Sequence, residues 1–506
     1  MMNRKVDLNS LLISANLLIM GLLFYALMRA EPNRYVNQAS ILLGIVLCVQ
    51  TNIALWLERR QRDPFVILLA FTTTFYYSLR IFTLTVYDYS DVFDRYPYDA
   101  TDSAFALIVI LSANTALYLG LHLAKIKGPQ AVDARDWEAV SSTRIALLLV
   151  AAIFFAYFSG AAAVDPEAAA SRLISVAGMF LAPNVIVLMS LSYFFLFRRT
   201  LSRAFAVTIA TLIALEMIVH TLSGSRSAIV GIAQDCILVG LAMAGSIRVR
   251  KKSLLVAVAL LPLLAGLLVG SFVISTYNRA VRVVGAPLDV RQAFESAMVS
   301  GGSLSVASSL DLVLPPVFSR AGYFDYAAEV IAHRQQYRSV INLSSYGRSI
   351  VDNILTPGFD VYDQPKISNA LHFIYGEMGL PSKARSSEDY QSDQLGIYGE
   401  FYDLFGFACL PVLAAGAYLL KRSYAKFRSV NPFGLMMKRI VVLFVFEKML
   451  DSYGVDWTMV EAIALVTAIF IYTQIFFAIR RRSMSEVIPG TLPGGGDALT
   501  GLSGPR

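Results

Sequence analysis

Long apolar segments alternate with short polar ones along most of this 506-residue chain. An uninterrupted apolar run of about 18 residues or more predicts a helix that crosses a membrane. About 12 such runs are present, at Leu11–Met28, Ser40–Leu57, Pro64–Val86, Ser103–Ala124, Ile145–Ala163, Leu173–Phe197, Phe205–Leu222, Ile229–Ser246, Leu254–Ile274, Phe401–Leu420, Ile440–Trp457 and Glu461–Ile479. The pattern predicts an all-α, polytopic integral membrane protein with one long loop between the ninth and tenth helices.

The composition excludes an ordinary soluble protein. Hydrophobic residues make up 56% of the chain and charged residues 16%, and the mean hydropathy is +0.58. The runs divide the chain into residues 1–274 with nine helices, a loop at 275–400, three helices within 401–482, and a Gly/Pro/Ser-rich tail at 483–506 that we expect to be disordered. Cys48, Cys236 and Cys409 fall inside apolar runs, which predicts small core residues and no disulfide framework.

The basic residues predict how the helices are oriented. Lys and Arg gather in alternate loops, including Arg59, Arg60, Arg62, Lys125, Lys127, Arg198, Arg199, Arg203, Arg248, Arg250, Lys251 and Lys252. Because positive residues are retained on the cytoplasmic side of a membrane, we place both termini in the cytoplasm and the loop 275–400 outside. The net charge of +7 is then an orientation signal, and we expect no nucleic-acid partner.

Several arginines lie on the predicted outer side against this bias. They are Arg226, Arg279, Arg282, Arg291, Arg320, Arg334, Arg338, Arg348 and Arg385. Guanidinium groups bind phosphate oxygens with two parallel hydrogen bonds, so the group predicts a site for a lipid pyrophosphate. Arg334 and Arg338 lie one turn apart in Tyr323–Arg338, a stretch with helical spacing. An ordinary ion pair with an acidic residue of the same loop is the alternative for each arginine.

Candidates for acid–base chemistry are few. We expect the base that takes a proton from a sugar hydroxyl among His333, His372 and Glu400, with Glu377 and Asp403 as further carboxylate alternatives. The alternatives are surface histidines and, for Glu400, an acidic residue that favours the start of a helix. No phosphate loop, dinucleotide-binding glycine pattern, HExxH or zinc-type cysteine pair is present, so the sequence predicts neither a cofactor nor a metal site.

Ionisable residues also occur inside the predicted spans, where an unpaired charge is costly. They include Arg80, Glu216, His220 and Asp235. Each needs a partner, a water-filled cavity or a function. Ion pairs between helices are as good an explanation for them as a substrate site.

Two short stretches carry a resemblance to a known family. Gly224–Ser227 (GSRS) follows the seventh span, and Gly399–Gly406 (GEFYDLFG) opens the tenth. Arg291 and Gly302 match a pattern of Arg, ten residues and Gly that some family members carry in outer loops. With the many spans and the single long loop late in the chain, these features make the sequence similar to the Wzy-type polymerases of bacterial O-antigen and exopolysaccharide synthesis, whose architecture the O-antigen ligases share.

The resemblance implies an enzyme of the bacterial inner membrane that moves a growing glycan from undecaprenyl pyrophosphate onto a new lipid-linked repeat unit. As a hypothesis, Arg226, Arg279, Arg282 and Arg291 bind the pyrophosphate, and Arg334 and Arg338 help to hold the glycan or the donor. The resemblance also implies partners, namely the lipid-linked oligosaccharide, membrane lipid, a flippase and a chain-length regulator.

Three alternatives remain open at this stage. An O-antigen ligase would use the same donor and transfer the finished chain to lipid A core. A glycosyltransferase that uses polyprenyl-phosphate sugars would need an acidic residue in an early outer loop, for which Tyr87–Asp102 is the candidate. A flippase of the lipid-linked unit would suit the number of spans, but the long loop and the lack of a repeat between the two halves argue against it.

Overall fold

The computed structural model describes the chain in separate stretches. They are residues 5–29, 31–58, 63–86, 98–124, 132–134, 136–139, 142–162, 183–197, 201–222, 228–244, 248–250, 323–352, 361–362, 367, 370, 374, 395–429, 431–451, 454–477 and 479–481. Six helices in these stretches are long and apolar enough to cross a membrane: Leu8–Arg29, Gln38–Glu58, Pro64–Val86, Ala100–Leu123, Gly396–Lys426 and Thr458–Ile475. The protein is thus an all-α membrane protein, and the total of about 12 spans stays a prediction.

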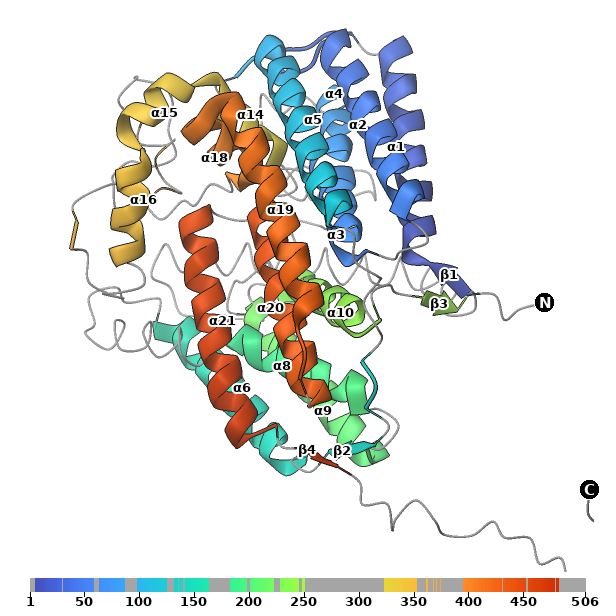
Figure 1. Cartoon of the computed structure of the whole chain (residues 1–506), viewed down its shortest axis with the longest axis vertical. Coiled ribbons are helices and arrows are strands. Elements are labelled where there is room, and N and C mark those ends of the chain that lie inside the picture. Colours follow the sequence, from blue (N-terminus) through green and yellow to red (C-terminus); the bar gives the residue numbers. More distant parts are fainter. Residues whose placement is uncertain are drawn as a thin grey trace, which may run out of the picture.

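The first four spans form a bundle on one side of the molecule (Figure 1). They are α1 (Leu8–Arg29), α2 (Gln38–Glu58), the continuous helix α3–η1–α4 (Pro64–Thr72, Thr73–Ser78, Leu79–Val86) and α5 (Ala100–Leu123). Polar caps explain where two of them begin. The Asp63 carboxylate accepts from the Phe65 amide directly before Pro64, and Asp99 and Asp102 form a capping box at the start of α5.

A π-helical turn interrupts the third span at Thr73–Ser78 (η1). Its Thr73 hydroxyl accepts a hydrogen bond of 3.2 Å from the Asn114 side chain of α5, and the Tyr398 hydroxyl of α18 (Gly396–Phe405) donates to the same Asn114. The rings of Tyr77 and Tyr398 meet edge to face with centroids 5.0 Å apart. The turn therefore connects the third span to both α5 and α18, and π-turns of this kind are common at functional sites.

The remaining helices lie lower in Figure 1 or cross its centre. They are α6 (Ser142–Ala162), α8 (Pro183–Phe197), α9 (Arg203–Leu222), α10 (Ala228–Ala244), α19 (Cys409–Lys426), α20 (Pro432–Asp451) and α21 (Val455–Ile475). Two short antiparallel strand pairs accompany them: β1 (Lys5–Asp7) with β3 (Arg248–Arg250), and β2 (Trp137–Ala139) with β4 (Ile479–Arg481). Each pair joins two segments that the charge pattern places on the same side of the membrane.

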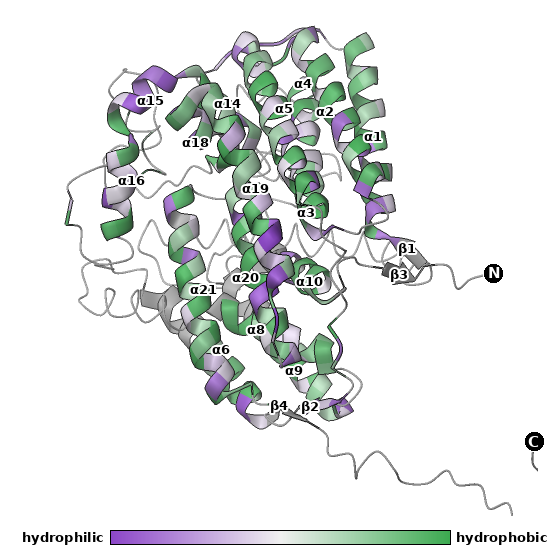
Figure 2. Ribbon diagram, in the orientation of Figure 1, coloured by the Kyte–Doolittle hydropathy of each residue, from purple (hydrophilic) through white to green (hydrophobic). Residues whose placement is uncertain are grey.

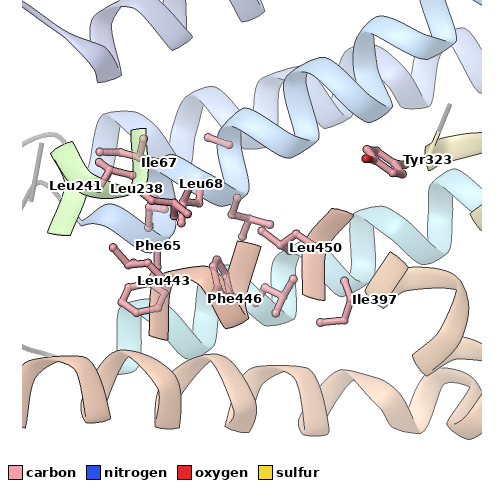
Figure 3. Packing of buried hydrophobic residues seen from close by; sticks show 14 of the residues in the cluster. Phe65, Ile67, Leu68, Leu238, Leu241, Tyr323, Ile397, Leu443, Phe446 and Leu450 are labelled. Carbon is pink, nitrogen blue, oxygen red and sulfur yellow. The ribbon is translucent and has the colours of Figure 1, made fainter. Parts of the chain in front are cut away.

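Part of the predicted outer loop folds against the spans. It contains α14 (Tyr323–Ala332), α15 (Arg334–Val340) and α16 (Leu343–Ile350), and a short 3-10 turn η4 (Gly406–Ala408) later joins α18 to α19. Side chains of α14 share one apolar core with the span helices, a core in which Phe65 and Phe446 meet edge to face at 5.2 Å (Figure 3). In contrast, α15 is visibly polar (Figure 2). The described part of the loop is therefore continuous with the membrane domain.

Glycines account for the largest differences from the predicted helix boundaries. The predicted run Ile440–Trp457 is wrong as a single helix, because α20 ends at Asp451 and Gly454, at a φ of +122°, precedes α21. The tenth span begins at Gly396 and is broken at Gly406, whose φ is +59°. Only glycine adopts such backbone angles without strain, and a hydropathy pattern does not reveal them.

At the opposite end from α14, a buried ion pair joins Lys421 of α19 to Asp63, the cap of α3. The Lys421 ammonium also donates to the Leu121 carbonyl of α5 at 2.6 Å. Beside it, His122 of α5 lies 3.2 Å from the Glu58 carboxylate of α2. These contacts hold four helix ends together on the side that is predicted to be cytoplasmic.

Gly120 allows α5 and α19 to pack backbone against backbone. A Cβ at this position would collide with the Ala414 carbonyl of α19. We expect Gly120→Ala to lower the free energy of unfolding by about 1–3 kcal/mol, because the two helices must separate. Gly416→Ala is the matched control, since a Cβ there meets nothing within 4 Å. Unfolding of the two purified variants in detergent measures their stabilities. Equal stability of Gly120→Ala and Gly416→Ala would contradict the prediction.

Candidate functional site

Arg80, predicted as an intramembrane charge, has a structural partner. Its guanidinium lies fully buried and donates to the Asp325 carboxylate of α14 through Nε at 2.8 Å, with Nη2 at 2.8 Å from the same oxygen. The Tyr98 hydroxyl donates to the other Asp325 oxygen at 2.6 Å. Both carboxylate oxygens are therefore bonded, and the ion-pair alternative fits Arg80 better than a substrate site. The pair fastens α14, and with it the described part of the long loop, to the third span.

The strongest concentration of chemistry lies on α18. This short helix has a left-handed glycine at each end, Gly396 and Gly406, and it carries Glu400 and Asp403 one turn apart on the same face. Glu400 is 1% exposed and Asp403 is 0% exposed. Three neighbouring elements cover these acids, namely α15, α16 and the start of α21.

Asp403 is a buried carboxylate that forms no hydrogen bond with the described residues. Neither of its side-chain oxygens has a donor among the described residues. Arg334 and Arg338 of α15 are the cations that act on it electrostatically. A buried acid that is not neutralised by bonds of its own is poorly explained as a structural group, because leaving it unpaired costs about 1–3 kcal/mol or more. It is well explained as a group that binds a ligand or accepts a proton when the protein functions.

The two arginines of α15 differ in their surroundings. Arg334 donates from Nε to the Asp403 carbonyl at 3.1 Å and lies over the Tyr402 ring, 5.2 Å from its centroid. It also packs on Gly406, where a Cβ would lie 3.2 Å from Nη2. Arg334 therefore binds the carboxyl end of α18, where a cation is favourable. Arg338, one turn later, is exposed and is free to meet a ligand from outside.

Glu400 takes part in a different set of contacts. Its Oε2 accepts from the Val455 amide at 2.8 Å, at the start of α21. Its Oε1 faces Asp456, and a Cβ on Gly454 would lie 2.9 Å from that atom and 2.9 Å from Asp456 Oδ1. Tyr346 of α16 lies beside the Glu400 carboxylate, and burial together with this charge raises the pKa of the Tyr346 hydroxyl well above its ordinary value.

The structure brings together only some of the predicted site residues. Glu400, Arg334 and Arg338 lie around α18, and His333 lies between α14 and α15, where its amide donates to the Glu329 carbonyl. Asp235 is half-buried on α10. The other candidates lie outside the described residues or have side chains outside them: Arg226, Arg279, Arg282, Arg291, His372, Glu216 and His220.

Two residues that matter here lie where no sequence pattern marks them. They are Asp325 and Asp456, each of which lies in a stretch without a motif and far along the chain from its partner. Asp325 is 245 residues from Arg80. The only usable signal was that a charge inside a span requires an opposite charge elsewhere.

Metal ligands of the usual kind do not gather in the part of the chain that the structure describes. No three His, Cys, Asp or Glu side chains lie close enough there to hold an ion. Comparison of the chain with family models, curated proteins and solved structures finds no match. The arrangement around α18 is therefore the basis on which a function can be assigned.

Proposed function

We propose that the protein is a membrane glycosyltransferase that polymerises oligosaccharide repeat units linked to undecaprenyl pyrophosphate, at the outer face of the bacterial inner membrane. One observation carries the proposal. At the end of an apolar span, the unbonded carboxylate of Asp403 lies within the electrostatic reach of two arginines, Arg334 and Arg338. A lipid-linked pyrophosphate donor needs this combination of cations, a base and an adjoining apolar surface.

Asp403 and the arginines each have a role in the proposed transfer. The acceptor hydroxyl loses its proton to Asp403 as its oxygen forms a bond to the anomeric carbon of the donor glycan. The bond from that carbon to the pyrophosphate oxygen breaks, and the electron pair leaves with the lipid pyrophosphate. Arg338 binds the leaving group, together with the arginines Arg226, Arg279, Arg282 and Arg291 of the sequence hypothesis. Arg334 positions Asp403 from the end of α18.

Asp403 is a better base than the residues favoured from the sequence. The Glu400 carboxylate already accepts a hydrogen bond from the Val455 amide and lies opposite a second acid, Asp456. His333 lies at the junction of two helices, whereas neither oxygen of Asp403 is bonded to a residue that the structure describes. A base whose lone pairs are not engaged in the folded protein can accept a proton without first breaking a bond. Because Asp403 is completely covered, the acceptor reaches it only when the covering side chains move aside.

The test is a profile of lipid-linked glycans and surface polysaccharide in a strain that lacks the gene, by gel electrophoresis and mass spectrometry. We expect loss of polymer and accumulation of single repeat units, both reversed by the wild-type gene. Full-length chains left on undecaprenyl pyrophosphate would instead identify an O-antigen ligase, which uses the same donor chemistry. An unchanged profile would reject both functions. A flippase and a chain-length regulator are the partners that a polymerase requires.

A further inference from the structure

An exposed aromatic patch lies beside the proposed transfer site and takes no part in the transfer itself. It consists of Phe105 in the second turn of α5 and Phe407 in the turn η4, which are 40% and 48% exposed. Their ring centroids lie 6.5 Å apart. Both rings also meet the buried ring of Tyr402 of α18 edge to face, Phe105 at 6.0 Å and Phe407 at 5.4 Å. Three elements that are far apart in sequence therefore build one apolar surface.

Tyr402 also connects this patch to a positive charge. The Arg334 guanidinium lies over the Tyr402 ring, 5.2 Å from its centroid, and packs on Gly406, the first residue of η4. Its Nε donates to the Asp403 carbonyl, and no further acceptor for Arg334 is found among the described residues. The Nη groups can therefore donate to a ligand at the edge of the patch. Arg338, one turn later on α15, is exposed.

The patch lies near the ends of two helices that cross the membrane. Phe105 is close to the start of α5, and Phe407 comes directly before α19. The start of α5, α15 and α18 lie at the same end of the molecule (Figure 1), the end that the charge pattern predicts to be outside. A cation next to an exposed apolar surface at this level matches a lipid that carries a phosphate group, because the phosphate and the chain need different surroundings.

Contact with bulk lipid explains the patch less well. Trp and Tyr are the aromatic residues that are enriched at membrane interfaces, because their polar groups reach the headgroups. Both exposed rings of the patch are phenylalanines, which have no polar group. The ring contacts with Tyr402 also hold them in one arrangement. A surface that is fixed before binding loses less conformational entropy when a ligand packs on it, which favours a specific lipid.

We propose that Phe105 and Phe407 bind the part of the donor's polyprenyl chain next to the headgroup, while Arg334 and Arg338 bind its pyrophosphate. The identity of this lipid rests on the proposed function. The two phenylalanines contact neither the glycan nor the bond that breaks, so they are positioning residues. They hold the lipid so that its headgroup lies beside the carboxylate of Asp403.

Binding of farnesyl pyrophosphate tests the patch without any transfer reaction. This probe carries the donor's pyrophosphate on a short polyprenyl chain. Full-length protein in phosphatidylcholine nanodiscs is titrated in a calorimeter with farnesyl pyrophosphate and with inorganic pyrophosphate, and empty nanodiscs correct for partition into lipid. We expect the double variant Phe105→Ala with Phe407→Ala to bind farnesyl pyrophosphate about tenfold more weakly, because the chain loses apolar contact. Its affinity for inorganic pyrophosphate should not change.

Phe470→Ala is the matched control. Phe470 is 69% exposed, and it lies about four turns along α21 from the end that contacts α18. This variant should bind both probes as the wild type does. Wild-type affinity in the double variant, or an equal loss in Phe470→Ala, would overturn the proposal. If the double variant failed to unfold cooperatively, the single variants Phe105→Ala and Phe407→Ala would decide, each with an expected loss of about threefold.

Phosphatidylglycerol nanodiscs test the competing occupant, an ordinary anionic phospholipid. If the patch prefers a polyprenyl chain, farnesyl pyrophosphate should bind in these nanodiscs with an affinity within about threefold of that in phosphatidylcholine. Loss of binding in phosphatidylglycerol would show that bulk phospholipid fills the site, and would overturn the proposal. A wild-type protein that binds farnesyl pyrophosphate no better than inorganic pyrophosphate would do the same.

Kinetics of polymer formation separate an error in this proposal from an error in the proposed function. The double variant should raise the KM for lipid-linked repeat units about tenfold and leave kcat nearly unchanged, because the chain makes the same contact in the ground state and the transition state. Polymer formation with an unchanged KM in this variant would reject the patch and keep the polymerase. A wild-type protein that binds farnesyl pyrophosphate through the patch but forms no polymer would reject the polymerase and keep the lipid site.

Discussion

Asp403→Asn is expected to lower the rate of glycan transfer by about 10²–10⁴-fold, the usual contribution of a general base. The amide has nearly the same shape as the carboxylate but does not accept the proton of the acceptor hydroxyl. Since neither oxygen of Asp403 has a hydrogen bond among the described residues, the substitution breaks no bond. It also removes a buried charge, so the unfolding temperature should stay the same or rise.

The measurement is polymer formation by purified protein from lipid-linked repeat units, next to thermal unfolding of the same samples. Asp136→Asn is the control, because its carboxylate is exposed near β2, far along the chain from α18. Wild-type transfer by Asp403→Asn would show that another group is the base. A variant that loses transfer and stability together would show that Asp403 has a structural role instead.

Arg80→Met is expected to destabilise the protein by about 3–5 kcal/mol, the usual result of breaking a buried ion pair by removing one partner. The variant leaves the Asp325 carboxylate fully buried, with the Tyr98 hydroxyl as its remaining donor among the described residues. Because this pair joins α14 to the third span, α14 should be the first element to lose its protection from hydrogen exchange. Chemical unfolding in detergent micelles gives the change in free energy.

The double variant Arg80→Met with Asp325→Leu is the critical control. It replaces the pair by apolar side chains and leaves no buried charge, so it should recover most of the lost stability. A double variant that is as unstable as Arg80→Met alone would show that packing around Arg80 matters and the unpaired carboxylate does not. The stability of Arg80→Lys should lie between that of the wild type and that of Arg80→Met. The lysine ammonium keeps the charge but lacks the planar two-donor geometry.

Much of the membrane-embedded fold follows from the apolar runs. The predicted Pro64–Val86 span has the same ends in the structure, and Ser103–Ala124 differs from α5 by a few residues. The π-turn within the third span and the breaks at Gly406 and Gly454 were not predictable in this way. The length of an apolar run shows whether a segment can cross the lipid bilayer, whereas breaks within a helix depend on individual backbone angles.

The apolar pattern is enough to establish a helical membrane protein, because a chain this apolar has to satisfy its backbone hydrogen bonds within helices when it is placed in lipid. It also identified Arg80, Arg334, Arg338 and Glu400 as charged residues that need an explanation. Their partners become apparent only from the way the helices pack. Arg80 pairs with Asp325, Arg334 binds the end of α18, and Glu400 faces Asp456. Such pairings depend on which helix faces pack together over long separations in sequence, and no local spacing encodes that choice.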